Sequence, residues 1–262
     1  MSTLTSLNMT QKWSPPKPEA FQIVDPIPAP VKRAVVWPWK AGAAAWDELK
    51  YSIRSVEKYL DDKDCPFYIV CESPPYFLSR NPGRVKIVNA WLYQTAVLYG
   101  TQLADEVLWM NDDICLLKPT SWDELKSSVL HLGEIAEKDA HKWLADPDIN
   151  LWRKGLARAV LSLRHKSKEP VLNYSTHTPY VYEREKALEI FKTYGLWHKI
   201  PLETLYYNHF RTSSRKVTVE KTSELPAPDA WFLNYTDSRL TPQLRDALAK
   251  LFPEHYSWEH KS

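Results

Sequence analysis

The chain has 262 residues, of which 44% are apolar, enough for one large domain or two small ones with a buried core. Its formal net charge of +2 is close to neutral, so charge alone does not indicate a nucleic-acid-binding protein. No apolar stretch is long enough to cross a membrane and the N-terminus lacks the apolar core of a secretory signal, so we expect a soluble, cytoplasmic protein.

The first 30 residues are rich in proline and show little periodicity, which is typical of an extended segment. From residue 31, apolar runs with strand character alternate with stretches whose apolar residues recur at helical spacing. The expected strands cover 31–37, 67–71, 85–88 and the apolar run that ends at 110, and the expected helices cover 46–60 and 91–103. This order predicts a mostly parallel α/β sheet with helices on its faces.

After residue 119 the pattern becomes mainly helical. The expected helices cover 122–132, 138–144, 151–163, 183–194, 203–210 and 242–252, with strand or turn at 172–182 and a short strand at 231–235. The three cysteines, Cys65, Cys71 and Cys115, lie in or beside apolar runs and lack metal-ligand spacing. We therefore expect buried, reduced thiols in an intracellular protein.

Three polar residues, Asn111, Asp112 and Asp113, separate two apolar runs. Acidic residues at the carboxyl end of a strand lie where open α/β sheets bind their ligands. Two carboxylates and an amide supply hard oxygen ligands, which hold Mg²⁺ or Mn²⁺ against a diphosphate. The alternative is an ordinary turn between two strands, since Asn and Asp both favour turns. Burying three polar groups without a partner is costly, which favours ligand binding.

The helix expected at 151–163 has apolar residues on one face, and we expect four basic residues on the other: Arg153, Lys154, Arg158 and Arg164. Such a charge run is usually a solvated helix face. The functional alternative is a surface that follows an anionic acceptor, such as a phosphate backbone.

The acidic triplet, in its setting between two apolar runs, resembles the DxD motif of nucleotide-sugar glycosyltransferases of the GT-A fold. Asn111 and Asp113 occupy the outer positions, so an amide replaces the first carboxylate. Three further segments are similar to a phage-encoded branch of these enzymes: 48–55 to a first-helix motif, 173–179 to a His-Pro element, and 251–259 to a C-terminal Phe-Pro end. That branch also resembles the Stealth sugar-phosphate transferases. The resemblance covers residues 31 to about 259.

The resemblance implies a single large GT-A-like domain in which 31–120 bind the nucleotide sugar and 121–262 face the acceptor. It implies a metal-dependent glycosyltransferase that takes its sugar from a nucleotide sugar, with a UDP-sugar as the expected donor. The implied Mn²⁺ or Mg²⁺ ligands are Asn111, Asp113 and His177, while Asp112 contacts either the ribose or the metal. The ordinary alternative for His177 is a structural histidine beside a proline turn, and His209 is a weaker candidate.

The expected nucleotide contacts follow the first two strands. Trp37 or Trp39 would stack on the base, Lys40, Lys50 or Arg54 would meet phosphate, and Glu72 ends the second strand. Ordinary packing or solvent exposure is the alternative for each of them. An inverting reaction needs a base for the acceptor hydroxyl, for which His177 and Asp237 are the candidates; a retaining reaction needs none.

Two other classes of function remain open. One is a Stealth-type enzyme that transfers sugar phosphate, and the other is a non-enzymatic protein of the same fold that binds a nucleotide or DNA. For a glycosyltransferase, the preferred acceptor is a hydroxymethylated base in phage DNA, which the enzyme would have to expose. The near-neutral charge fits a saccharide or protein acceptor equally well.

Overall fold

The computed structural model describes residues 30–40, 42, 47–79, 82–90, 92–218, 223–226, 229–235 and 240–260. Apart from Pro30, the proline-rich segment lies outside these residues. A central sheet has the strand order β3-β2-β1-β4-β7. Its strands are β1 (Val31–Pro38), β2 (Phe67–Cys71), β3 (Val85–Asn89), β4 (Ala104–Trp109) and β7 (Tyr180–Glu183). The first four are parallel and β7 is antiparallel to β4, so the prediction of a mostly parallel α/β sheet is confirmed.

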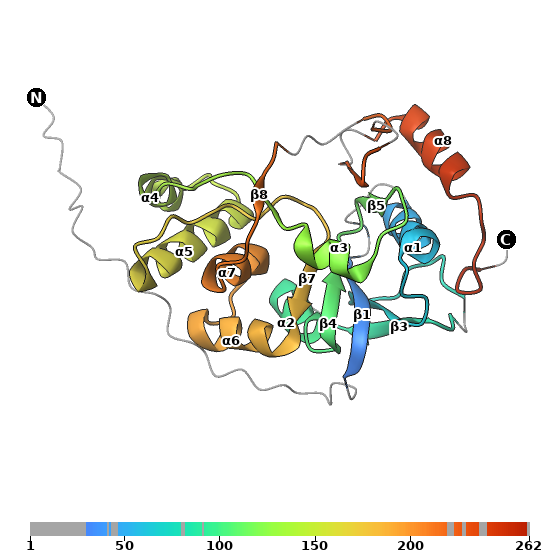
Figure 1. The fold of residues 1–262 in the computed structure, drawn as a ribbon, viewed down its shortest axis with the longest axis horizontal. Helices are drawn as coiled ribbons and strands as arrows, with labels where there is room; N and C mark the ends of the chain where they lie inside the picture. The colour runs from blue at the N-terminus through green and yellow to red at the C-terminus, as the bar shows by residue number, and fades with distance from the viewer. Residues whose placement is uncertain are drawn as a thin grey trace, which may run out of the picture.

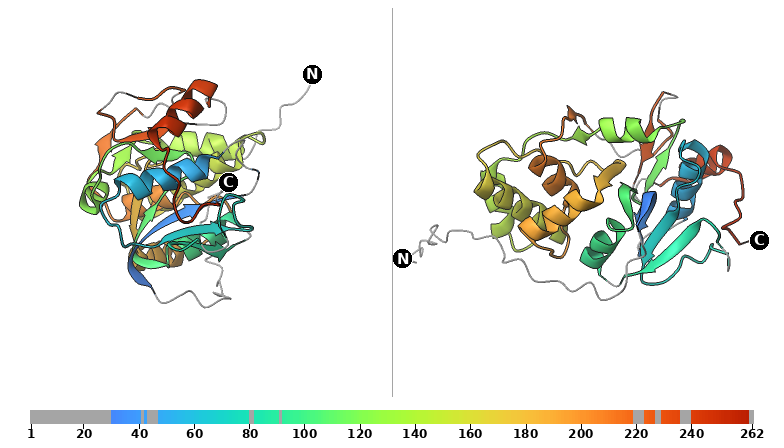
Figure 2. Two further views of the ribbon diagram at one scale, coloured as in Figure 1. Left: turned by 90° about the vertical axis from the view of Figure 1, so that its right-hand side faces the viewer. Right: turned by 60° about the horizontal axis from the view of Figure 1, so that its bottom comes forward.

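Helices cover both faces of this sheet (Figure 1). On one face lie α1 (Glu48–Tyr59) and α3 (Trp122–Ser127), with α8 (Pro242–Leu251) outside α1. On the other face lie α2 (Tyr93–Gly100), α5 (Leu151–Lys166), α6 (Arg184–Tyr194) and α7 (Leu202–His209), with α4 (Glu137–Ala145) against α5. The two further views separate these layers (Figure 2).

Side chains of β1 alternate between the two cores, as the pleat requires. Val35 and Trp37 pack with α1 and α3, whereas Ala34 and Val36 pack on the side of α2 and α5. Because residues 34–37 are buried in one core or the other, only the residues from Pro38 onward can reach a ligand at the end of β1.

Two of the expected helices are shorter in the structure. The helix expected at 122–132 begins with a capping box between Ser121 and Glu124 and ends at Ser127. The chain then forms β6 (Leu130–His131), which pairs with β8 (Arg215–Lys216), a contact too distant in sequence to be read from local periodicity. The helix expected at 91–103 covers only Tyr93–Gly100.

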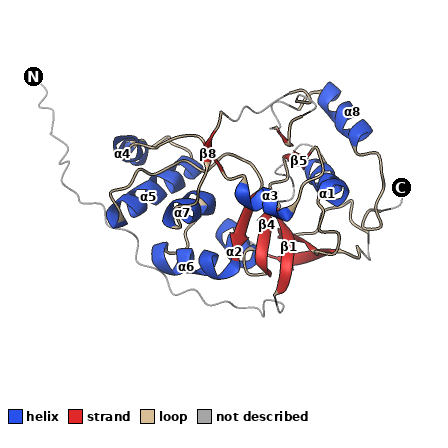
Figure 3. Ribbon diagram, viewed as in Figure 1, coloured by secondary structure: helices blue, strands red, loops and turns tan. Residues whose placement is uncertain are grey.

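A second pair of short strands follows the acidic triplet. β5 (Ile114–Leu116) pairs antiparallel with β9 (Phe232–Asn234), which comes from near the end of the chain. Figure 3 shows these strands apart from the central sheet, on the side of α1. The pairing of β5 with β9 holds the turn at 111–113 against a segment more than a hundred residues away in the sequence.

The strand order creates a switch point between β1 and β4. From β1 the chain continues outward through β2 and β3, and then returns to β4 on the other side of β1. In open α/β sheets, the carboxyl ends of strands at such a point flank the crevice where ligands bind. The segments 38–40 and 111–113 leave the sheet here.

No helix among the described residues is long and apolar enough to span a membrane. The thiols of Cys65, Cys71 and Cys115 are buried and not joined in disulfides, as expected. Burial raises the pKa of Cys65 and Cys71 to about 11, so both thiols are protonated at neutral pH.

Candidate functional site

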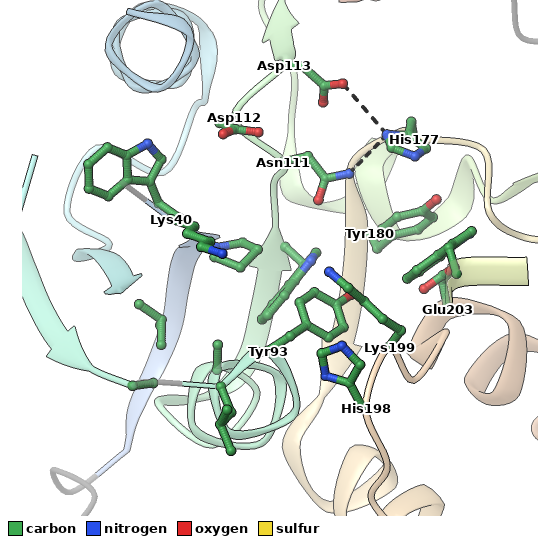
Figure 4. A pocket seen from close by; sticks show the side chains of 18 of the residues that line it. Lys40, Tyr93, Asn111, Asp112, Asp113, His177, Tyr180, His198, Lys199 and Glu203 are labelled. Atoms are coloured by element: carbon green, nitrogen blue, oxygen red, sulfur yellow. Dashed lines mark hydrogen bonds and ion pairs between the residues drawn. The ribbon is translucent and has the colours of Figure 1, made fainter. Parts of the chain in front are cut away.

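A cavity of about 580 Å³ opens at this switch point, between the sheet and the helices of its second face. On the side of β1 and β2 it is lined by Trp39, Lys40 and Glu72, and at the end of β4 by the triplet 111–113. Residues from the second half of the chain close the opposite side (Figure 4). Its volume lies in the range of small-molecule and cofactor sites.

The acidic turn and His177 lie together, although 64 to 66 positions separate them in the sequence. The Nδ1 atom of His177 is 3.4 Å from the Asn111 amide nitrogen and 3.7 Å from Oδ2 of Asp113 (Figure 4). The side chain of Asp113 is only 13% exposed, whereas that of His177 is 42% exposed and accessible from the cavity. The structure therefore brings the three residues expected as metal ligands to one place.

The backbone of His177 is held in an unusual conformation. Its φ of 50° lies in the left-handed region, which few residues other than glycine adopt. The amide of Asn234 on β9 donates to the His177 carbonyl at 2.6 Å and fixes this turn. Strained backbone of this kind persists where the surrounding structure enforces it, and it is frequent at functional sites.

Asn111, Asp113 and His177 are the residues at this end of β4 that could hold a metal ion. Among the described residues, no group of three or more His, Cys, Asp or Glu side chains is arranged to hold a metal ion. Mg²⁺ in nucleotide sites needs only one or two carboxylates, because substrate phosphates and water complete its shell. The 3.4 Å contact of Asn111 is made by its amide nitrogen, which donates hydrogen bonds, so the amide oxygen is the atom of Asn111 that could bind a cation. Asp113 supplies one carboxylate beside His177, and substrate phosphates and water would have to complete the shell of such an ion.

The residues expected to contact the nucleotide divide into two groups. Trp39, Lys40 and Glu72 line the cavity beside Asp112. Trp37 does not, and its assignment as a stacking residue is wrong. Its ring is fully buried against Phe67 on the α1 side of β1, and its indole N–H donates to Ser52 at 2.9 Å.

Arg54 and Lys50 of α1 make contacts within the protein instead of lining the cavity. Arg54 is buried in an ion pair with Glu259 and donates to the Phe252 carbonyl, so its assignment to phosphate is wrong. Lys50 pairs with Asp47 at 3.8 Å and is absent from the cavity lining.

Two further candidates from the second half of the chain are not among the residues that line the cavity. His209 lies elsewhere and is hydrogen-bonded to Tyr194 and Glu189. Asp237, the second candidate base, lies outside the described residues.

Sequence reasoning missed Glu203 on α7, a buried carboxyl group in the cavity lining. The Ser175 hydroxyl donates to its Oε1 at 2.6 Å, two residues before His177. Burial raises the pKa of Glu203, an effect that the Ser175 hydrogen bond and the nearby His177 only partly offset. The signal in the sequence was one glutamate in a helical stretch, 202–207, whose other residues are apolar or uncharged. The structure buries all six of these residues.

The basic surface expected on α5 is not a single face, and that prediction is wrong. Arg153 and Arg164 are eleven positions apart and lie within ~20° on the helix, but Arg158 is ~140° from Arg153. Arg164 pairs with Glu134 at 2.9 Å, and Lys154 donates to the Pro147 carbonyl. Residues 159–163 are all buried, so the helix belongs mainly to the core.

No protein-family model and no curated protein matches this sequence.

Proposed function

We propose that the protein is a metal-dependent glycosyltransferase of GT-A type that transfers a sugar from a nucleotide sugar, with a UDP-sugar as the expected donor, to an acceptor hydroxyl. One observation carries the proposal: Asn111, Asp113 and His177 converge at the end of β4, inside a cavity at the β1/β4 switch point. Ligand binding at this point of an α/β sheet is the general rule.

The β1 side of the cavity suits the nucleotide. Trp39 is half-buried and offers a ring face for stacking, and its backbone N–H is fixed by the Val70 carbonyl at 3.0 Å. Glu72 can accept hydrogen bonds from ribose hydroxyls, and the ammonium group of Lys40 can meet phosphate. Both are exposed and line the same cavity as Asp112, so the diphosphate would extend toward the acidic turn.

Asp113, Asn111 and His177 would hold a divalent cation, which when bound offsets the negative charge that develops on the leaving diphosphate. Asp113 supplies the charged oxygen ligand, and Asn111 supplies a neutral one. His177 would coordinate through Nδ1, the ring nitrogen that faces both of the others.

Glu203 is our candidate for the base that takes the proton from the acceptor hydroxyl. Its carboxylate lies across the cavity from the β1 side, and its raised pKa brings proton exchange closer to neutral pH. The oxygen that loses its proton would attack the anomeric carbon as the bond to diphosphate breaks. A base on the acceptor side implies inversion at that carbon.

A screen of nucleotide sugars tests the proposed function. Thermal stabilisation and hydrolysis would be measured for UDP-, GDP-, CMP- and dTDP-sugars with Mn²⁺, and acceptor products would be weighed by mass spectrometry. A mass increase of one sugar supports the proposal, and a mass increase of one sugar phosphate supports a Stealth-type transferase. Binding without turnover of any donor would support the non-enzymatic alternative.

DNA with hydroxymethylated bases stays a proposed acceptor, to be offered in this screen beside saccharides. The α5 surface no longer supports it, because its basic residues point in different directions and two of them are engaged within the protein. The side chains that line the cavity are therefore the remaining structural evidence on the acceptor.

Replacing His177 with alanine should lower the transfer rate roughly 100-fold or more, the size of a lost acid, base or ligand at the reacting groups. The melting temperature should change little, because the side chain is partly exposed and Asn234 binds its backbone rather than its ring. His165→Ala, an exposed histidine on α5, is the matched control. A large drop in melting temperature with normal activity per folded molecule would indicate a structural histidine.

Replacing Glu203 with glutamine should lower transfer roughly 100-fold while leaving donor binding unchanged. Because its folded-state pKa is raised, the stabilising contribution of this group is complete below its ordinary pKa of 4.5 and is lost as pH rises through the raised value. The free energy of unfolding of the variant, relative to wild type, should therefore increase between about pH 4 and about pH 7. Urea unfolding at both values checks this, with exposed Glu169→Gln as the control. Undiminished transfer would remove Glu203 from the mechanism.

A further inference from the structure

The side of the cavity opposite the nucleotide carries a lysine that the proposed donor chemistry does not use. Lys199 lies in the loop between α6 and α7, and its side chain enters the cavity beside Tyr93 and His198 (Figure 4). Asp113 lies at the far end of the same view. Lys199 thus belongs to the side of the cavity that carries Glu203.

The loop that presents Lys199 is fixed in place by its backbone. Lys199 has a φ of 57°, and together with His177 and Arg211 it makes up the set of described non-glycine residues with positive φ. Its carbonyl packs directly on α5 at Gly155, where a Cβ atom would stand only 2.1 Å from the carbonyl oxygen. Glycine inside a helix costs about 1 kcal/mol relative to alanine, so α5 gives up intrinsic stability to let this loop approach.

The ammonium group of Lys199 contacts an aromatic ring and, among the described residues, pairs with no carboxylate. Its Nζ lies 4.8 Å from the ring centre of Tyr93, and Tyr93 in turn meets the indole of Trp152 edge to face. Within the described part of the chain, no carboxylate comes within 4.0 Å of this ammonium group. A half-buried cation in a cavity wall that pairs with none of the described carboxylates is suited to an anionic group of a ligand.

We propose that Lys199 binds a phosphate ester on the acceptor, so that the acceptor is a phosphorylated compound with a free hydroxyl group. This inference rests on the proposed function. The donor diphosphate has its own partners at Lys40 and the acidic turn, whereas Lys199 shares its side of the cavity with Glu203, our candidate base. Tyr93 and Trp152 offer ring faces to a sugar or a base of that acceptor. The phosphate could belong to a nucleotide of DNA or to a sugar phosphate.

Binding of small probes by titration calorimetry tests the inference. The probes are thymidine 5′-monophosphate against thymidine, and glucose 6-phosphate against glucose, with glucuronate as the carboxylate counterpart. Each is titrated into wild type, Lys199→Met and Lys192→Met, with and without saturating UDP and Mn²⁺. Lys192 is an exposed lysine on α6 and controls for the lost charge. UDP binding is measured first, so that failure of the proposed donor site is seen separately.

We expect at least one phosphate ester to bind roughly tenfold tighter than its unphosphorylated counterpart, the size of one charge-assisted hydrogen bond. Lys199→Met should abolish this preference with unchanged UDP affinity, and Lys192→Met should retain it. The pair that shows the preference identifies the nucleotide or the sugar phosphate as the source. The inference is overturned if neither ester is preferred, if the preference survives in Lys199→Met, if glucuronate is preferred equally, or if Lys199→Met weakens UDP binding instead.

Discussion

Replacing Asp113 with asparagine is expected to remove nearly all sugar transfer, by a factor of about 1,000 or more, while the protein stays folded. The substitution keeps the shape of the side chain but removes the negative charge that would hold the cation. Loss of several kcal/mol of charge stabilisation in the transition state corresponds to a rate loss of this size. The fold should persist because the backbone carbonyl of Asp113, which accepts from the Tyr235 N–H at 3.3 Å, is unchanged.

Transfer would be measured with Mn²⁺ and again in excess EDTA, together with a melting curve for each protein. Asp148→Asn serves as the control, since Asp148 is exposed in a loop and absent from the cavity lining. Wild-type activity in EDTA, or an Asp113→Asn protein as active as wild type, would refute the proposed metal site. Normal metal dependence in the Asn111→Ala protein would restrict the site to Asp113 and His177.

Replacing Arg54 with alanine should cost about 3–5 kcal/mol of unfolding free energy, the largest loss of stability that we expect from a single substitution here. The guanidinium group donates to both oxygens of Glu259, at 2.9 and 2.5 Å, and both side chains are almost fully buried. Removing the arginine leaves a carboxylate without its partner in a low-dielectric interior. The pair joins α1 to the last described segment of the chain, so that segment should detach first.

Urea unfolding of Arg54→Ala, Glu259→Ala and an Arg54→Leu, Glu259→Leu double variant would measure this loss. The double variant should recover much of the stability, because apolar side chains can replace a buried ion pair. Lys186→Ala, which breaks an exposed pair with Glu183, should change the free energy by at most about 1 kcal/mol. A single Arg54→Ala variant as stable as wild type would contradict the role assigned to the pair.

Local patterns in the sequence predicted the order of strands and helices well, because burial of one face leaves a period of two or 3.6 residues. The acidic triplet was recognisable for a related reason, since polar residues that follow a buried run mark the end of a strand. Trp37 and Trp39 show the limit of this reasoning. The two residues are two positions apart and share one side of the chain, but Trp37 lies within β1 and is buried in the core, whereas Trp39 lies beyond the end of the strand and lines the cavity. The sequence alone does not show where β1 ends.

Contacts between distant residues could not be predicted from these patterns. Arg54 resembles any basic residue on an amphipathic helix until its partner, 205 positions away, is known. Glu203 was overlooked because its helix carries no motif, and its importance comes from burial beside Ser175. The basic residues of α5 were assigned to one helix face, but the helical angles between the individual positions spread them around the helix.

The short strand β9 has a consequence for the order in which the protein is completed during synthesis. The backbone N–H of Tyr235, just after β9, donates to the Asp113 carbonyl, and Asn234 on β9 holds the His177 carbonyl. Both halves of the candidate metal site are therefore anchored by residues that are synthesised after them. The acidic turn is made more than a hundred residues before β9, yet it can reach its final alignment with His177 only when β9 has been added. A nascent chain that stops short of β9 would carry every residue of the cavity without an assembled site.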